Sequence, residues 1–203
     1  MEPFIRLRGV AAPLPLPNVD TDRIIPARFL KRSRADGYGS VLFHDLRYDA
    51  QGRDRDDFIL NREPFRRASI LVADDNFGCG SSREAAVYAL QDYGIRAIVA
   101  PSFGDILYNN CLKNGIVPVR LDQVTVSALL RTLLEGCDNH VTVDLENLLV
   151  MLPGGEQKTF DIDPFWQECL IKGIDDLELT LGHERDIDQF EARYYAEQPW
   201  AAL

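Results

Sequence analysis

The sequence predicts an α/β fold in which a partly parallel sheet with helical crossovers is followed by additional short strands. Between residues 69 and 134, short apolar runs alternate with helical patterns three times. Parallel strands need long crossover connections, so this β-α-β-α-β-α order indicates a parallel sheet. After residue 140 the helical pattern gives way to short runs typical of strands, with Gly154-Gly155 as a turn between the last two. A length of 203 residues with 46% hydrophobic content suits one domain over residues 1–203.

The chain is expected to begin with a strand from Phe4 to Val10. Residues 11–17 then carry three alternate prolines. Proline fixes φ and lacks a backbone donor, so this stretch is predicted to be an extended loop or an edge segment and not central sheet.

Residues 18–26 form a polar stretch that has two interpretations. Asp20 and Asp22 could cap a helix from Pro26 to Lys31, with the proline in its first turn. Alternatively, a polar loop faces a site, and Arg28 or Lys31 contacts an anion.

Residues 28–57 are irregular and charged, and connections of this length are usually lids or binding loops. Phe43 and Tyr48 favour a lid that packs, and we predict a mobile substrate loop. His44 beside Asp45 suggests acid–base chemistry, but adjacent residues on a helix do not face each other.

The middle of the chain supplies the expected crossovers. Pro118 marks the strand predicted at 116–119 as an edge strand. In order, the predicted elements are a strand at 69–73, a helix at 82–92, a strand at 95–100, a helix opened by Pro101-Ser102, a strand at 116–119 and a helix from Asp122 to Leu134.

The last part of the chain is expected to hold three short strands and two helices. The strands are predicted at 141–143, 148–151 and 158–160. Asp163-Pro164 begins a helix over 165–172 that ends at Gly173. An amphipathic helix spans 186–197, and residues 198–203 form a frayed tail.

The stretch from Asn76 to Glu84 carries the strongest chemical signal. Gly78 and Gly80 can adopt φ > 0 and expose backbone N–H groups after a buried strand. A helix start adds free N–H donors and a positive dipole end, and Arg83 adds a planar fork for a carboxylate. Such a place binds carboxylate or phosphate.

A structural interpretation of the same residues is a capping box, with Ser81 as N-cap and Glu84 three residues later. The sequence alone does not separate a cap from a cap that also binds an anion. The helix start predicted after residues 101–105 follows a neighbouring strand. Two helix starts beside one cleft favour the anion site, because ligands bind beyond the carboxyl ends of parallel strands.

Composition excludes several classes of protein. The net charge of −10 argues against a nucleic-acid surface. The chain shows no signal peptide and no apolar run long enough for a membrane span. Cysteines at positions 79, 111, 137 and 169 form no C-x-x-C pair, so we expect free thiols in a reducing cytoplasm and no metal site on this chain.

Three blocks then occur in order: Asn18-Val19-Asp20-Thr21-Asp22-Arg23-Ile24-Ile25-Pro26, the glycine stretch Asn76–Glu84, and Ala100-Pro101-Ser102-Phe103-Gly104-Asp105-Ile106. Two shorter stretches, Phe29-Leu30-Lys31 and Leu42-Phe43-His44-Asp45-Leu46-Arg47-Tyr48, lie between the first two blocks and add to the pattern. This series resembles the small subunits of bacterial 3-isopropylmalate dehydratases, in the aconitase superfamily. The resemblance covers nearly the whole chain, and the first two blocks together are highly specific.

The resemblance implies a swivelling β/β/α domain of the aconitase last-domain type. It implies a large-subunit partner that carries a [4Fe–4S] cluster, and the isomerisation of 2-isopropylmalate to 3-isopropylmalate in leucine biosynthesis. Ser81 would be the base that removes and returns the proton on carbon. The implied substrate-binding residues are Gly80, Ser82, Arg83, Asp20, Thr21, Arg28 and Lys31.

One position departs from the family. Ala85 follows Ser-Ser-Arg-Glu where these subunits usually have histidine. The departure leaves open a small subunit for another alkylmalate, of the citraconate, homoaconitate or dimethylmalate type.

The implied reaction agrees with a division between two chains. Hydroxide is a poor leaving group, so a Lewis acid must accept it. The sequence shows no metal site, and a second chain is therefore expected to bring the metal. Two other classes stay open: a thiol enzyme that uses Cys79, and a dicarboxylate-binding module without catalysis.

Overall fold

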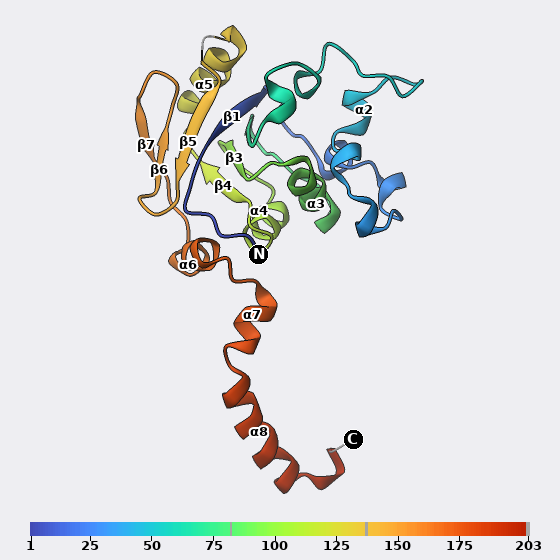
Figure 1. The fold of residues 1–203 in the computed structure, drawn as a ribbon, viewed down its shortest axis with the longest axis vertical. Coiled ribbons are helices and arrows are strands. Elements are labelled where there is room, and N and C mark those ends of the chain that lie inside the picture. Colours follow the sequence, from blue (N-terminus) through green and yellow to red (C-terminus); the bar gives the residue numbers. More distant parts are fainter. Residues whose placement is uncertain (82, 137, 202–203) are drawn as a thin grey trace.

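Within residues 1–81, 83–136 and 138–201, which the computed structural model describes, seven strands form one sheet in the order β4-β3-β2-β1-β5-β6-β7 (Figure 1). The half from β1 to β4 is parallel and the half from β5 to β7 is antiparallel, which confirms the predicted α/β class. The strands are β1 (Arg6–Leu14), β2 (Ile70–Ala73), β3 (Ala97–Ala100), β4 (Val117–Arg120), β5 (His140–Asp144), β6 (Leu149–Met151) and β7 (Gln157–Thr159).

The central strand, β1, includes residues that the sequence predicted to lie outside the sheet. It pairs with β5 through Arg6–Val10 and with β2 through Ala11–Leu14. Ala11 N donates to Asn139 O at 2.8 Å. Because N–H direction alternates along a strand, the missing N–H of Pro13 lies on the β5 side, where pairing has already ended. The proline is therefore tolerated in a central strand, and the predicted loop over residues 11–17 is wrong for its first four residues.

Helices cover both faces of the parallel half. The helices α3 (Glu84–Tyr93) and α4 (Asp105–Lys113) are crossovers between parallel strands, α5 (Gln123–Glu135) connects β4 to β5, and α6 (Pro164–Lys172) follows the antiparallel strands. Strand residues alternate between two cores. Leu71, Ala73, Ile98 and Ala100 face the core that α3 completes, whereas Ile70, Val72, Ala97 and Val99 face the core that α5 and α6 complete.

The helix boundaries follow local chemistry that the sequence shows. Asp122 accepts a hydrogen bond from Thr125 N at 2.9 Å and caps α5. Asp163 caps α6 in the same way through Phe165 N at 2.8 Å. These starts confirm the prediction, as does the left-handed Gly173 at the end of α6. Pro118 lies in β4, which is the predicted edge strand.

Residues 21–67 pack as short turns over the α3 face. They include α1 (Thr21–Ile24), α2 (His44–Arg47) and single 3-10 turns such as Ala27–Phe29. The predicted helix from Pro26 to Lys31 is therefore wrong. Asp20 caps α1 through Arg23 N at 2.7 Å, so the helical turn comes earlier, before the proline. Buried side chains anchor the segment 28–57 to the core, namely Tyr38, Val41, Leu42 and Phe43. Its mobility stays a prediction.

The chain ends in an arm, defined here as residues 175–201, that extends away from the sheet (Figure 1). It consists of α7 (Asp176–Leu181), α8 (Glu184–Glu197) and a 3-10 turn at Pro199–Ala201. Sequence reasoning missed α7, although Asp175 and Glu178 form a capping box that could have revealed it. None of the described helices combines the length and apolar character needed to cross a bilayer.

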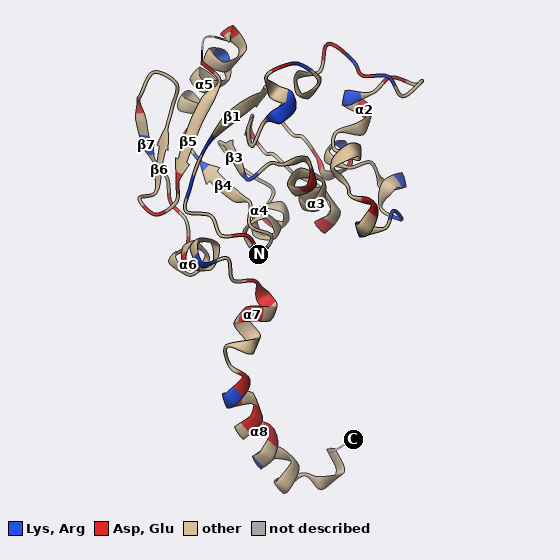
Figure 2. Cartoon of the chain, in the orientation of Figure 1, with Lys and Arg blue, Asp and Glu red and all other residues tan. Residues whose placement is uncertain are grey.

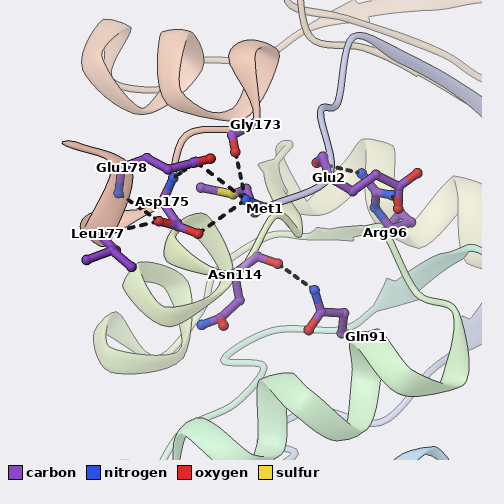
Figure 3. A network of polar contacts seen from close by, with 9 residues as sticks. All are labelled: Met1, Glu2, Gln91, Arg96, Asn114, Gly173, Asp175, Leu177 and Glu178. Atoms are coloured by element: carbon purple, nitrogen blue, oxygen red, sulfur yellow. Dashed lines mark hydrogen bonds and ion pairs between the residues drawn. The ribbon is translucent and has the colours of Figure 1, made fainter. Parts of the chain in front are cut away.

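A polar network joins the first residues of the chain to the start of this arm (Figure 3). Met1 N donates to Gly173 O at 2.7 Å and to Asp175 Oδ2 at 3.4 Å. Glu2 forms an ion pair with Arg96 at the foot of β3. The root of the arm is thus fixed against the body by residues far away in sequence.

Candidate active site at the glycine loop

The loops that leave β1, β2 and β3 continue the strand order beyond the sheet. Gly78 N donates to Val19 O at 2.7 Å, and Thr21 N donates to Cys79 O at 3.0 Å. On the other side, Phe77 N donates to Ser102 O at 3.1 Å. The three sequence blocks that carried the resemblance therefore meet at one edge, beyond the carboxyl ends of parallel strands, as predicted.

Two glycines of this loop are required by its geometry. Gly78 has φ +74°, and an added Cβ would overlap the side chain of Leu107 on α4. Gly80 has φ +95° but has room around it. The first glycine thus allows the loop to pack on α4, and the second turns the chain toward Ser81.

Ser81 lies at the exposed end of the glycine loop, but it does not cap the helix. The helix α3 begins at Glu84, and its N-cap is Arg83, which makes no side-chain capping bond. The predicted capping box of Ser81 and Glu84 is therefore wrong. The glycine turn carries the chain past Ser81 before the helix begins, so this hydroxyl is not used as a cap.

Thr21 and Asp20 reach the same edge from α1. The buried Thr21 donates its hydroxyl to Ser81 O at 2.9 Å and fixes the backbone that carries the serine. Asp20 pairs with Cys79 as a backbone bridge, and its carboxylate caps α1. The structure thus brings Asp20 and Thr21 to the glycine loop as predicted, in positions that support it.

Arg83 is held by a carboxylate of this chain. Its Nη2 donates to Asp22 Oδ2 at 2.7 Å, and Nη1 forms an ion pair with the other carboxylate oxygen without an aligned hydrogen bond. The Arg83 side chain is only 17% exposed, whereas that of Asp22 is 57% exposed. The hydrogen bond from Arg83 lowers the pKa of Asp22 and raises that of Arg83. Sequence reasoning missed Asp22 in this role.

Arg28 belongs to a different cluster. It donates from Nη1 to Asp45 Oδ2 at 2.9 Å and contacts His44 Nδ1 at 3.2 Å. These three residues line a hollow of about 750 Å³ together with Tyr48, Asp49 and Arg55, and its described lining includes no residue of the glycine loop. Lys31 is exposed. The structure therefore does not bring Arg28 or Lys31 to Ser81 within this chain.

His44 and Asp45 contact each other, contrary to the sequence argument. His44 Nδ1 lies 3.1 Å from Asp45 Oδ1. The helix α2 is a single turn that follows a left-handed Phe43, and both side chains fold toward Arg28. The rule for regular helices does not hold for such a short one. The Arg28 hydrogen bond holds the pKa of Asp45 at about 2.

Ser82, a predicted carboxylate-binding residue, lies outside the described residues.

A polar cluster that the sequence did not predict supports the loop from the other side. Ser102 Oγ accepts from Asn76 N at 2.9 Å and donates to Asp75. Asn76 Nδ2 donates to Asn18 Oδ1 at 2.8 Å, and both asparagines have positive φ. The signal was the pair of asparagines, which tolerate the left-handed region.

The cysteine thiols and the arrangement of potential metal ligands bear on two expectations: a thiol enzyme that uses Cys79, and the lack of a metal site on this chain. Cys79, Cys111 and Cys169 are free, and burial raises the pKa of the Cys111 and Cys169 thiols. Cys137 lies outside the described residues. Among residues that the structure describes, no group of three or more His, Cys, Asp or Glu side chains is arranged to hold a metal ion.

Comparison with known families and structures agrees with this geometry. The family model described as the aconitase C-terminal domain matches residues 1–124. A second model, described as the C-terminal domain of the 3-isopropylmalate dehydratase small subunit, matches residues 179–202. A solved structure titled 3-isopropylmalate dehydratase (leuD), from Methanocaldococcus jannaschii, aligns with TM-score 0.63 and 24% identity over 93% of this chain and 99% of that one. At that identity the likeness shows the fold, and it confirms the predicted type.

Curated relatives extend the likeness to the whole chain. The 3-isopropylmalate dehydratase small subunit of Rhodospirillum centenum is 53% identical over 99% of both chains. The protein of the same name from Dinoroseobacter shibae is 50% identical over 98% of this chain and 100% of its own length. The chain therefore belongs to the family of 3-isopropylmalate dehydratase small subunits, which contains the aconitase C-terminal domain.

Proposed function

We propose that this chain is the small subunit of 3-isopropylmalate dehydratase, a hydro-lyase of leucine biosynthesis that acts in the cytoplasm. The observation that carries the proposal is 53% identity to a protein of that name over 99% of both chains. The reaction converts 2-isopropylmalate to 3-isopropylmalate by removing and returning water. The glycine loop, which is exposed at Gly80 and Ser81, is the part of this chain that would meet the substrate.

Ser81 is the base in this proposal. A serine hydroxyl is weak at neutral pH, so its oxygen must be stabilised as an anion when it removes the proton on carbon. The helix α3 begins three residues after Ser81, and its N-terminal end supplies positive potential at this part of the loop. The Thr21 hydrogen bond to Ser81 O keeps the serine backbone in place. Donors that are fixed before the reaction stabilise developing charge at little cost in reorganisation.

Arg83 binds a substrate carboxylate in this proposal, together with Gly80 and Ser82. Asp22 already accepts a hydrogen bond from Nη2 and forms an ion pair with Nη1, and it is the more exposed member of the pair. An incoming carboxylate therefore exchanges with Asp22 or uses the remaining N–H groups of the fork. Either way, Asp22 holds the guanidinium against α1 before substrate arrives.

In this proposal the site is completed by the large subunit. That partner carries a [4Fe–4S] cluster, which supplies the Lewis acid that accepts the leaving hydroxide. Arg28 and Lys31 reach the substrate only when the partner closes the cleft, because the isolated chain holds Arg28 away on Asp45.

One alternative substrate is favoured by a specific residue. Ala85 lies in the first turn of α3, next to Glu84 and Arg83, where the resemblance leads us to expect histidine. Its side chain is partly buried against the core that α3 completes, so the substitution alters packing at the start of the helix that follows Arg83. A related alkylmalate is the second candidate substrate.

The test is co-expression with the large subunit of the same organism and anaerobic purification of the complex. Turnover is then measured with 2-isopropylmalate, citramalate, homocitrate and 2,3-dimethylmalate. We expect the largest kcat/KM for 2-isopropylmalate. A larger value for another member of the panel would transfer the assignment to that substrate. In that event, a shift of the Ala85→His variant toward 2-isopropylmalate would identify position 85 as the cause.

A further inference from the structure

Among the residues that the structure describes, polar contacts tie the arm of residues 175–201 to the body at its root. Lys113 Nζ lies 2.8 Å from Asp176 Oδ2, and Met1 N contacts Asp175. The described polar side-chain contacts of α8 stay within the arm, and neither hydrophobic core contains an arm residue. Figure 1 shows α8 extended away from the sheet and its helices.

The exposed helix nevertheless carries a continuous apolar face. Ile187, Phe190 and Tyr194 are spaced three and four residues apart, which places them on one side of α8. Phe190 is 54% exposed, and its ring stacks on Tyr194 with 5.6 Å between centroids. The same residues, with Tyr195, line a hollow of about 580 Å³. On α7, Leu177 and Leu181 repeat the pattern and are also exposed.

An unsupported helix of this kind is not expected to persist by itself. Isolated helices shorter than about 12–15 residues are marginal in water, and α8 has 14 residues. Helices of globular proteins gain most of their stability by packing an apolar face. Contiguous exposed apolar side chains rimmed by polar ones mark interaction sites. The arm therefore has the composition of a docking element.

Charge indicates the chemistry of the occupant. Residues 175–201 contain eight Asp and Glu residues but two Arg residues, and acidic positions recur along α7 and α8 (Figure 2). The whole chain carries a formal charge of −10. A second copy would bring the same excess of negative charge to the contact, and like charges in an interface oppose association. A surface that complements this acidic, amphipathic arm is therefore an apolar groove with a basic rim.

The family models separate the arm from the rest of the fold. The aconitase C-terminal domain model ends at residue 124, whereas the model specific to 3-isopropylmalate dehydratase small subunits covers 179–202. The arm is thus a feature of chains that are named subunits of a larger enzyme. This points to an occupant that only such chains meet.

We propose that the apolar face of α8 docks into an apolar groove with a basic rim on the large subunit, and that this contact tethers the two chains. The inference rests on the proposed function, since it takes the large subunit as the partner. It assigns to the arm a role in assembly that is separate from the chemistry of the glycine loop.

The experiment measures the affinity of the full chain for its anaerobically prepared large subunit. We expect Phe190→Ala with Tyr194→Ala to weaken binding about tenfold or more, because exposed aromatics at an interface centre contribute most of its affinity. At saturating large subunit, kcat should equal that of the parent chain, since no glycine-loop residue changes. Binding of the parent should also weaken between low and high salt.

Phe165→Ala is the matched control. This aromatic residue of α6 is 50% exposed and lies outside the arm, so its removal should leave affinity unchanged. Parent-like affinity of the double variant would overturn the inference. Sedimentation that shows a dimer of the parent, a monomer of the variant and equal affinities for the large subunit would overturn it in favour of a second copy. Failure of the parent itself to bind the large subunit would remove the proposed function as well.

Discussion

Two regions of the chain hold the same ion pair in different surroundings. At the glycine loop, Arg83 pairs with Asp22, and in the segment 28–57, Arg28 pairs with Asp45. The Arg83 side chain is 17% exposed, whereas that of Arg28 is 53% exposed. Both arginines were predicted to bind substrate, and each already holds a carboxylate of its own chain.

The difference lies in what fixes each arginine. Arg83 follows a loop whose backbone extends the parallel sheet, and it begins a ten-residue helix. Arg28 lies in a single 3-10 turn on the surface. A side chain that is held by a rigid frame keeps its direction when substrate binds, whereas a side chain on a short turn can be redirected by a partner. We therefore expect the two regions to respond differently to substitution.

The largest effect is expected at Ser81. Ser81→Ala should lower kcat of the reconstituted complex by about 10²–10⁴-fold, the range for loss of a general acid or base. The urea midpoint of the isolated chain should stay unchanged, because Ser81 does not cap α3. Affinity for the large subunit serves as the control. Parent-like turnover would show that the base is elsewhere.

The next effect compares the two arginines directly. Arg83→Lys should cost about 1.5–3 kcal/mol in kcat/KM, because lysine cannot reproduce a bidentate contact with a carboxylate. Arg28→Lys should cost less, since its fork is on an exposed turn. Steady-state kinetics of both variants with the same large subunit provide the comparison. An equal loss for both substitutions would remove the distinction between the regions.

One glycine substitution in each region tests how tightly that region is packed. Gly78→Ala should destabilise the chain by about 2–5 kcal/mol, because it adds left-handed strain to an overlap with Leu107. Gly52→Ala adds strain alone, at about 1–2 kcal/mol, since nothing lies within 4 Å of its added Cβ. Urea unfolding of the isolated variants gives both values. Equal costs would mean that the loop does not pack tightly on α4.

The smallest effect is the pH dependence of the exposed pair. Asp45 has its pKa lowered from 3.8 to about 2, so its contribution to folding is present above pH 3.8 and disappears as pH falls through about 2. Since Asp45 is 57% exposed, solvent screening should keep the contribution below about 1 kcal/mol at neutral pH. Titration by carboxyl NMR should show the low pKa in the parent and a return toward 3.8 in Arg28→Ala. A normal Asp45 pKa in the parent would mean that this pair does not persist in solution.

Sequence reasoning located most of the fold because its signals were local. Asp122 and Asp163 cap their helices as predicted, Gly173 ends α6, and Pro118 marks the edge strand. The glycine loop was predicted as a site because glycine positions, a helix start and an arginine occur within nine residues.

The remaining features depend on contacts between distant parts of the chain. Pro13 is accommodated in the central strand because the pairing of β1 with β5 stops before it. Asp22 meets Arg83 across 61 residues, and no local pattern pairs them. The N-cap of α3 is Arg83 and not the predicted Ser81, and Thr21, 60 residues away in the sequence, holds the Ser81 carbonyl outside the helix. Hydrophobic periodicity and capping residues report local structure and do not reveal such long-range contacts.

The central claim is that this chain holds half of a catalytic site. It is tested most directly by assaying 2-isopropylmalate turnover with the purified chain, the anaerobic large subunit and their mixture. We predict turnover only in the mixture, with a rate that rises with the small subunit until binding saturates. Turnover by the purified chain without the large subunit or a metal would contradict the account.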